Sequence, residues 1–123
     1  MRAEKLNDKM TVNVLGTEYT IEKRKAEDDA NLQRADGYID TSVKLIVIEE
    51  MQEKQGTKLD LESYEKQVIR HEIIHAFLFE SGMDSSTYIC NEGWARNEEM
   101  VDWFAIQFVK ILEAFRSVGA EGR

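Results

Sequence analysis

The sequence predicts an α+β fold in which a small antiparallel sheet of three to four strands packs on two long helices. The first half of the chain contains short β-leaning segments, and the second half contains two stretches with helical spacing of apolar residues. No repeat or low-complexity tract divides the 123 residues, a length typical of one domain. We therefore expect a single domain over residues 1–123, with residues 1–58 mainly sheet and loops, a helix over 59–82 and a C-terminal helix over 91–117.

Four short segments have the composition of β-strands: residues 11–15, 18–23, 37–40 and 43–48. Gly16-Thr17 separates the first two and favours a hairpin, and Thr41-Ser42 is the expected bend of a second antiparallel pair. The segment 43–48 (VKLIVI) is rich in β-branched side chains, so it should be the best-buried strand. The charged stretch 26–36 is expected to be a loop or a helical turn.

The first helix is expected from about Asp60 to Ser81. Thr57 or Asp60 can cap its N-terminus, and Gly82 is a natural terminator. One face of this helix should carry a stripe of residues spaced alternately three and four apart: Leu61, Tyr64, Val68, His71, His75 and Leu78.

The second helix is expected from about Glu92 to Ser117, ending near Gly119. Its stripe has the same alternating spacing: Trp94, Glu98, Val101, Ala105, Phe108, Leu112 and Phe115. A buried carboxylate without a partner costs several kcal/mol, so Glu98 on a core-facing stripe needs a compensating charge. A divalent ion held by His71 and His75 would supply it. The aromatic residues of both helices are expected in the core, namely Phe77, Phe79, Trp103, Phe104 and Phe108.

Composition and charge exclude several classes of function. The net charge of −8 makes a nucleic-acid partner improbable. No run approaches the roughly 20 apolar residues that span a bilayer, so we expect no membrane partner. The first residues have no apolar stretch typical of a secretory signal, and the single cysteine, Cys90, cannot form an internal disulfide. These features indicate a soluble, cytoplasmic protein, and they say nothing about oligomeric state.

The most informative stretch is His71-Glu72-Ile73-Ile74-His75, which uses both histidines of the chain. Residues four apart lie on one face of a helix, so both imidazoles can bind one ion. Glu72 is then placed to take a proton from a water that the metal activates. This is the HExxH arrangement of zinc peptidases. A hydrogen-bonded core histidine is the alternative for either one taken alone.

Glu98 is the expected third zinc ligand, because it lies on the second stripe and Asp102 follows one helical turn later. Asp102 could accept the outward N–H of a ligand histidine and orient its ring, or it is an ordinary exposed acid. Glu99 points about 100° away around the helix, and Glu92 has no acid four residues on.

The pair of motifs, HExxH at 71–75 and Asn97-Glu98-x-x-x-Asp102, resembles the gluzincin signature of zinc metallopeptidases. Twenty-two residues separate His75 from Glu98, close to the gap in thermolysin-like enzymes. The resemblance implies a zincin-like domain in which Glu98 binds zinc and Asp102 orients the first histidine. The small size is similar to the minigluzincins and to the ImmA/IrrE-type peptidases of phages and mobile elements. For residues 1–60 the resemblance is architectural only.

The chain departs from thermolysin-like enzymes because it has no third histidine and ends soon after Phe115. Tyr88 is the expected substitute for the group that stabilises the oxyanion, and Arg96 is a weaker candidate. A packed or solvated loop tyrosine is the alternative. Cys90 could cap the zinc in a latent form, although a bystander thiol is the simpler interpretation.

The resemblance implies a zinc endopeptidase that hydrolyses a specific protein substrate, such as a repressor of a mobile element, with Glu72 as general base. The strand at 43–48 would be the rim of the cleft and would bind extended peptide at its outer edge. Two alternatives remain open. The domain could be an inactive zinc-binding regulatory module on the same scaffold, or a structural domain with an accidental motif.

Overall fold

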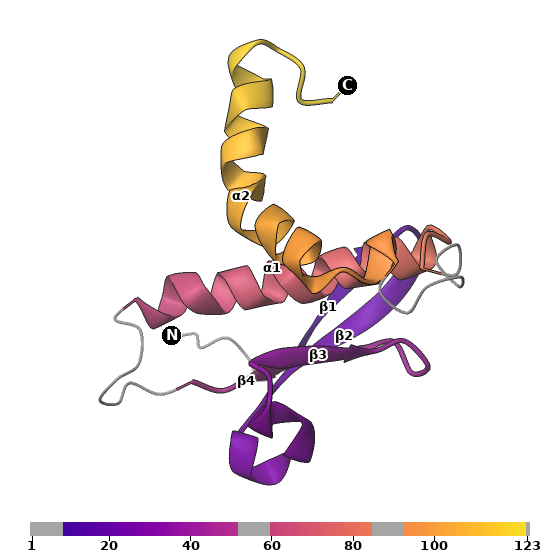
Figure 1. Cartoon of the computed structure of the whole chain (residues 1–123), viewed down its shortest axis with the longest axis vertical. Helices are drawn as coiled ribbons and strands as arrows, with labels where there is room; N and C mark the ends of the chain where they lie inside the picture. Colours follow the sequence, from indigo (N-terminus) through magenta and orange to yellow (C-terminus); the bar gives the residue numbers. More distant parts are fainter. Residues whose placement is uncertain (1–8, 52–59, 85–92, 123) are drawn as a thin grey trace.

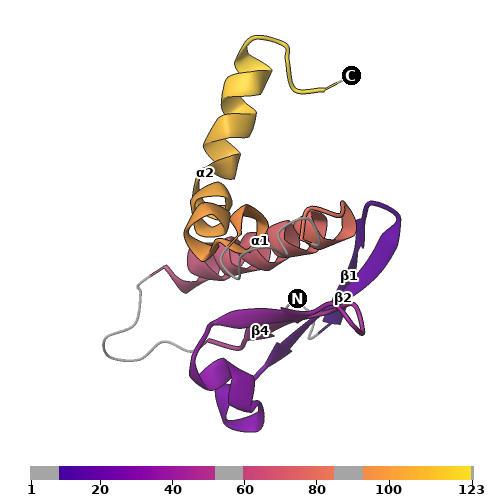
Figure 2. The same cartoon turned by 45° about the vertical axis from the view of Figure 1, so that its right-hand side comes forward.

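The computed structural model describes residues 9–51, 60–84 and 93–122. It is an α+β fold, as predicted, with a four-stranded sheet and two α-helices. Helix α1 (Leu61–Glu80) lies across one face of the sheet, and helix α2 (Glu98–Ser117) packs on the other side of α1 (Figures 1 and 2). In the described part of the chain, neither helix is long and apolar enough to cross a membrane.

Strands β1 (Lys9–Val14) and β2 (Thr17–Arg24) form the first expected hairpin. The turn is at Leu15-Gly16 rather than at Gly16-Thr17. Both turn residues have positive φ, 52° and 94°, and Asn13 Oδ1 accepts a hydrogen bond from Gly16 N at 3.0 Å. A two-residue turn of this kind matches the right-handed twist of the strands.

Strands β3 (Gly37–Asp40) and β4 (Leu45–Glu49) form the second expected antiparallel pair. The sheet order is β1-β2-β4-β3, and β4 runs parallel to β2. The expectation of a purely antiparallel sheet is therefore wrong. The chain leaves β2, passes to the far edge as β3 and returns in a tight hairpin, so β4 has the direction of β2. The most apolar segment thereby occupies the centre of the sheet, where Ile46, Val47 and Ile48 are fully buried.

This order corrects two expectations about the segment 43–48. Val43 is 63% exposed in the bend rather than buried in a strand. In addition, β4 has neighbours on both sides, so it cannot offer an edge to a peptide. The two edge strands are β1 and β3, and α1 contacts both.

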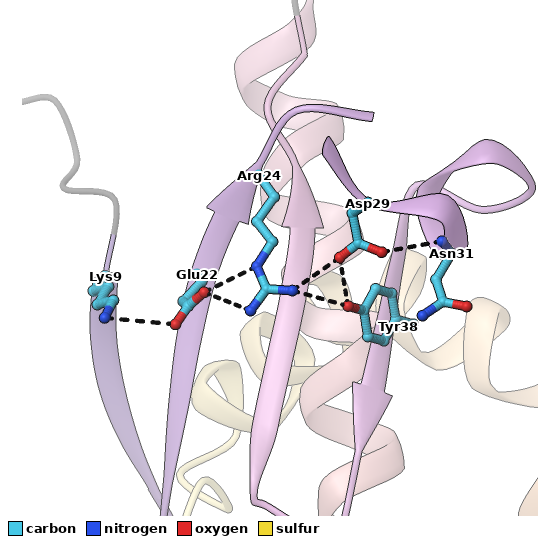
Figure 3. A network of polar contacts seen from close by, with 6 residues as sticks. All are labelled: Lys9, Glu22, Arg24, Asp29, Asn31 and Tyr38. Atoms are coloured by element: carbon cyan, nitrogen blue, oxygen red, sulfur yellow. Dashed lines mark hydrogen bonds and ion pairs between the residues drawn. The ribbon is translucent and has the colours of Figure 1, made fainter. Parts of the chain in front are cut away.

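The stretch between β2 and β3 forms two short 3-10 turns, Ala26–Asp28 and Ala30–Gln33, as expected of a loop with helical turns. An ionic network fastens this stretch to the sheet (Figure 3). The Arg24 guanidinium donates to Glu22 and to Asp29, and Asp29 also accepts the Tyr38 hydroxyl at 2.6 Å. Because Tyr38 belongs to β3, the network fixes the edge strand from the side opposite α1.

Helix α1 begins where predicted. The Asp60 carboxylate caps it by accepting from Ser63 N at 3.0 Å, and Gly82, with φ 87°, follows its end. The alternative cap, Thr57, lies outside the described residues. The buried residues of α1 are Val68, Glu72 and Ala76. This face is turned toward the sheet, so the expected stripe through His71 and His75 lies beside the core rather than in it.

Gly37 allows α1 to approach the edge strand closely. A Cβ atom at this position would lie 2.9 Å from Val68 Cγ1 and 3.1 Å from both Ile48 Cδ1 and the Val47 carbonyl oxygen. Gly37→Ala is therefore expected to lower the free energy of unfolding by about 1–3 kcal/mol through overpacking. Urea unfolding measures this change, and the cost of Gly37→Ala should be smaller in a Val68→Ala background than in wild type. A single variant as stable as wild type would contradict the close contact.

Helix α2 starts later than expected, at Glu98 rather than Glu92, because the Asn97 side chain caps it by accepting from Met100 N at 2.7 Å. A 3-10 turn, Trp94–Arg96, precedes the cap. Val101 and Ala105 are fully buried and pack on α1. Arg70 of α1 donates a hydrogen bond from Nε to the Ala105 carbonyl oxygen at 2.6 Å. Beyond this contact, α2 changes direction and leads away from the body of the molecule (Figure 1).

The expectation of a core built from helix aromatics is wrong. The five residues are 36% to 54% exposed: Phe77, Phe79, Trp103, Phe104 and Phe108. The core lies between α1 and the sheet, with Val14, Tyr19, Ile21, Ile46, Ile48, Val68 and Ala76 as its buried members. The two helices contact each other only over a short stretch, so the expected α1–α2 core does not extend along α2.

Candidate metal centre

His71 and His75 lie one turn apart on the face of α1 that is turned toward α2. Their ring centroids are 4.9 Å apart, with an interplanar angle of 67°. The Nε2 atom of each ring is 3.0 Å from the same atom, Oε1 of Glu98. The helical spacing of four residues therefore aims both imidazoles at one point, as expected.

Glu98 reaches this point because it is the first residue of α2. The Asn97 cap sets the start of the helix, and the side chain of the next residue is directed at the histidines. Desolvation alone would raise the pKa of Glu98, but hydrogen bonds from His75 and His71 and their positive charge outweigh it and lower the pKa below its usual value. The carboxylate is thus ionised, which is the form that binds metal.

The geometry of these three side chains suits a divalent ion. One ligand atom from each of His71, His75 and Glu98 lies within 4.8 Å of the others. Two ligands of a tetrahedral zinc are separated by about 3.3 Å, close to the 3.0 Å between Glu98 Oε1 and each Nε2. Two imidazoles and one carboxylate are also a usual donor set for zinc. The cluster could therefore hold a metal ion.

The expectation that Glu98 is buried in the core is wrong, because its side chain is 72% exposed. The first turn of α2 stands at the open side of the cluster, where water can solvate the carboxylate. The cost of burying an unpaired charge therefore does not explain Glu98. The convergence of the three ligand atoms is the observation that indicates a metal site.

Asp102 lies one turn after Glu98, and its Oδ1 is 3.3 Å from His71 Nδ1. The carboxylate is on the far side of the ring from Glu98, where it can hold the Nδ1–H and leave Nε2 free for metal.

If the cluster binds a divalent metal ion such as zinc, Asp102→Asn should weaken the affinity about 10- to 100-fold, because the neutral amide orients and polarises His71 less well. Competition with a chromophoric chelator measures the affinity. Glu99→Gln is the matched control, since Glu99 is the neighbouring acid on α2 and does not line the site. Equal affinities in the two variants would show that Asp102 is an ordinary surface acid.

Glu72 occupies the position between the histidines and the sheet. It is 6% exposed and makes no hydrogen bond or ion pair with any residue of the described ranges. Burial raises the pKa of Glu72 to about 7, the positive charge of His71 lowers it in part, and Glu98 raises it further. The carboxyl group is thus close to its titration midpoint at neutral pH, and no residue of the described part of the chain holds it as a structural partner.

This unpartnered acid should destabilise the metal-free protein. In the unfolded chain Glu72 loses its proton near pH 4.5, whereas the folded chain holds that proton until about pH 7, so stability is lost as the pH rises through this window. Glu72→Met should therefore raise the free energy of unfolding by about 2 kcal/mol at pH 8 and by much less at pH 5. Denaturation in the presence of chelator measures the gain. A gain that is equal at both pH values would contradict this assignment.

The metal cluster and Glu72 line one cavity of about 600 Å³. Its walls come from β3 and the two residues before it, from α1, and from the start of α2 with the 3-10 turn that precedes it. The lining residues are Ala35, Asp36, Gly37, Tyr38, Ile39, Tyr64, Gln67, Val68, His71, Glu72, His75, Arg96, Glu98 and Asp102. The cavity therefore runs beside β3, along the same side of the sheet that α1 covers.

Three of the other candidates from the sequence lie outside the described residues: Tyr88, Cys90 and Glu92. Arg96 lines the cavity, but its guanidinium is paired with Asp84 through two contacts of 3.2 Å.

Sequence reasoning missed Tyr64 as a cavity residue and treated it as an apolar stripe position. Its hydroxyl donates to Asp36, and burial, together with the Asp36 carboxylate, raises the pKa of Tyr64 to about 12. The signal was present, because Tyr64 lies seven residues before His71 and hence on the same helix face. The Asp36 partner could not be found without the course of the chain into β3.

Comparison with models of protein families, with curated proteins and with solved structures gives no match for this chain.

Proposed function

We propose that this protein is a zinc-dependent endopeptidase of the gluzincin type, with His71, His75 and Glu98 as zinc ligands. The observation that carries the proposal is the position of Glu72. Its carboxyl group is buried, has no hydrogen bond or ion pair among the described residues, and lines the same cavity as three convergent ligand atoms. A structural role would give this carboxylate a partner, whereas proton transfer needs it free.

Zinc, when bound, would supply Lewis-acid polarisation of the peptide carbonyl and activation of a water molecule. Glu72 takes the proton from the attacking water and passes it to the leaving amine, a role that suits a carboxyl group with a pKa of about 7. Asp102 holds the His71 ring in the orientation that leaves Nε2 directed at the site. No covalent intermediate with the protein is required.

The substrate would bind as an extended strand along β3. Asp36 O accepts from Glu49 N at 2.9 Å, and in an antiparallel ladder every second residue is turned toward its partner strand. Asp36, Tyr38 and Asp40 are thus bonded toward β4, so the backbone groups of Gly37 and Ile39 face the free edge. These groups border the cavity and can pair with a peptide backbone that continues past the site in both directions, as an endopeptidase requires.

The test combines metal analysis with a cleavage screen. Purified protein should bind one zinc per chain, His75→Ala should bind much less, and Glu99→Gln should bind as wild type does. The zinc-loaded protein should then cleave peptides in a proteome-derived library, and a chelator should stop the cleavage. Wild-type protein that retains no zinc after reconstitution would overturn the metal site. Zinc-loaded protein that cleaves nothing would favour the regulatory module.

A further inference from the structure

Asp36 and Tyr64 form a pair at one end of the cavity, and the proposed mechanism uses neither of them. The Tyr64 hydroxyl, on α1, donates to Oδ2 of Asp36. The backbone of Asp36 is fixed as well, because its carbonyl oxygen accepts from Glu49 N at 2.9 Å. Among the described residues, Oδ1 of Asp36 has no hydrogen-bond partner and the carboxylate forms no ion pair. Asp36 thus presents one available carboxylate oxygen from a fixed position.

The charge of the cavity is strongly negative. Four of the described residues that line it are acids: Asp36, Glu72, Glu98 and Asp102. Arg96 is the one lysine or arginine among the described lining residues, and its guanidinium is paired with Asp84. A divalent ion at the histidine cluster would balance two of the four negative charges. The cavity would therefore still attract a cation.

Two observations indicate that this charge is directed at an occupant of the cavity. Glu72 is 6% exposed and has no hydrogen bond or ion pair among the described residues, although it lines the cavity. The pKa of Tyr64, about 12, is raised first by burial, next by Asp36 and then by the charges of Asp102 and Glu49. The Tyr64 hydroxyl therefore lies in the field of three acids, and no cation from the described part of the chain offsets that field.

A second metal ion does not explain Asp36. Within the described residues, only His71, His75 and Glu98 bring ligand atoms close enough together to hold an ion. A cation with a single carboxylate as its main partner is instead typical of an ammonium or guanidinium group, which forms charge-assisted hydrogen bonds. The chemistry of the site therefore favours a basic side chain.

We propose that Asp36 binds a lysine or arginine side chain of the substrate, two to four residues from the scissile bond. This inference rests on the proposed peptidase function. It makes Asp36 a residue that determines specificity, and it assigns to Tyr64 the role of holding the carboxylate in place. The substrate class is then an extended, basic segment of a protein.

The distance along the cavity gives the spacing. Asp36 is bonded to Tyr64, and Gly37 lies against Val68, so β3 and α1 run in the same direction along the cavity. Tyr64 precedes His71 by seven residues, which is about 10 Å along the helix axis. An extended peptide rises about 3.3 Å per residue, so a peptide beside β3 covers this distance in about three residues.

Substitution within a cleaved peptide tests the proposal. Both ends of the peptide are blocked, so that neither terminus supplies a charge, and each lysine is replaced by norleucine, which lacks only the ammonium group. At one position, two to four residues from the bond, kcat/KM should fall about 10- to 100-fold. The side of the bond on which this position lies gives the direction of the peptide along β3.

Variants assign the preference to Asp36. Asp36→Asn should cleave the lysine and norleucine peptides equally well, because asparagine keeps an oxygen for the Tyr64 hydroxyl but has no charge. Glu62→Gln is the matched control and should retain the preference. It makes the same change in net charge at an acid of α1 whose side chain is 81% exposed and does not line the cavity.

The outcomes separate this inference from the proposed activity. Cleavage without a preference for lysine at any position would overturn the inference and leave the peptidase intact, as would a preference that survives in Asp36→Asn. If zinc-loaded protein cleaves nothing, fluorescence anisotropy measures its binding to blocked octapeptides of mixed sequence that contain lysine or norleucine. Binding at least about tenfold tighter for lysine, and lost in Asp36→Asn, would support the cation site without the peptidase. Equal binding of the two peptide sets would overturn both.

Discussion

Glu72→Gln is expected to keep zinc and to lose peptide hydrolysis by about 10²- to 10⁴-fold, the usual contribution of a general base. Glutamine has almost the same size as glutamate, so it fits the site between Val68 and Ala76 without a cavity. It cannot accept a proton from water near neutral pH. The proposed zinc ligands are other residues, so the affinity for metal should change little. The kinetics of a peptide found in the cleavage screen measure the loss.

Two further measurements make this result specific to Glu72. Glu65→Gln changes another acid of α1, one that pairs with Lys23 at 2.9 Å and does not line the cavity, so hydrolysis should be unchanged. Zinc stoichiometry of Glu72→Gln should remain one per chain. Hydrolysis that survives in zinc-loaded Glu72→Gln would remove Glu72 from the mechanism, and loss of zinc from this variant would show that Glu72 acts through the metal site.

Local patterns in the sequence were enough to predict α1 and its cap. Asp60 and Gly82 mark the ends of α1, and the spacing of His71 and His75 determines that both rings face one way. The first residue of α2 could not be predicted in the same way. Asn97 caps the helix only because the residues before it, Trp94–Arg96, form a 3-10 turn instead of continuing the helix. Asn97-Glu98 was nonetheless singled out by its resemblance to a motif.

Packing between elements could not be predicted from helical periodicity alone. The stripes of the two helices suggest a joint core, but periodicity does not say which element covers a stripe or how far the contact extends. Here the sheet covers the Val68 and Ala76 face, and α2 leaves α1 after Ala105. Likewise, composition identified β4 as the best-buried strand but could not reveal that it lies parallel to β2. That depends on the route of the chain around the sheet edge.

Removal of zinc is expected to lower the melting temperature by roughly 10–20 °C. Free zinc at a thousand times its dissociation constant contributes about 4 kcal/mol to stability, and each kcal/mol shifts the melting temperature of a domain of this size by a few degrees. The physical reason lies in the position of Glu98. The ion would join the first turn of α2 to two residues of α1, next to Val101 and Ala105, the buried residues of α2.

The loss of stability on zinc removal should therefore affect α2 before it affects the whole domain. After chelation, amide hydrogen exchange should accelerate over α2, while the amides of β4 in the sheet centre keep their protection. His75→Ala, which removes a ligand, should melt at the same temperature with and without zinc. All samples need one protein concentration, because association of copies would also raise the melting temperature. Protein that is verified to contain zinc could instead melt at the same temperature after chelation. In that case the ion does not link the two helices, and the direct contacts with α1 are enough to hold α2.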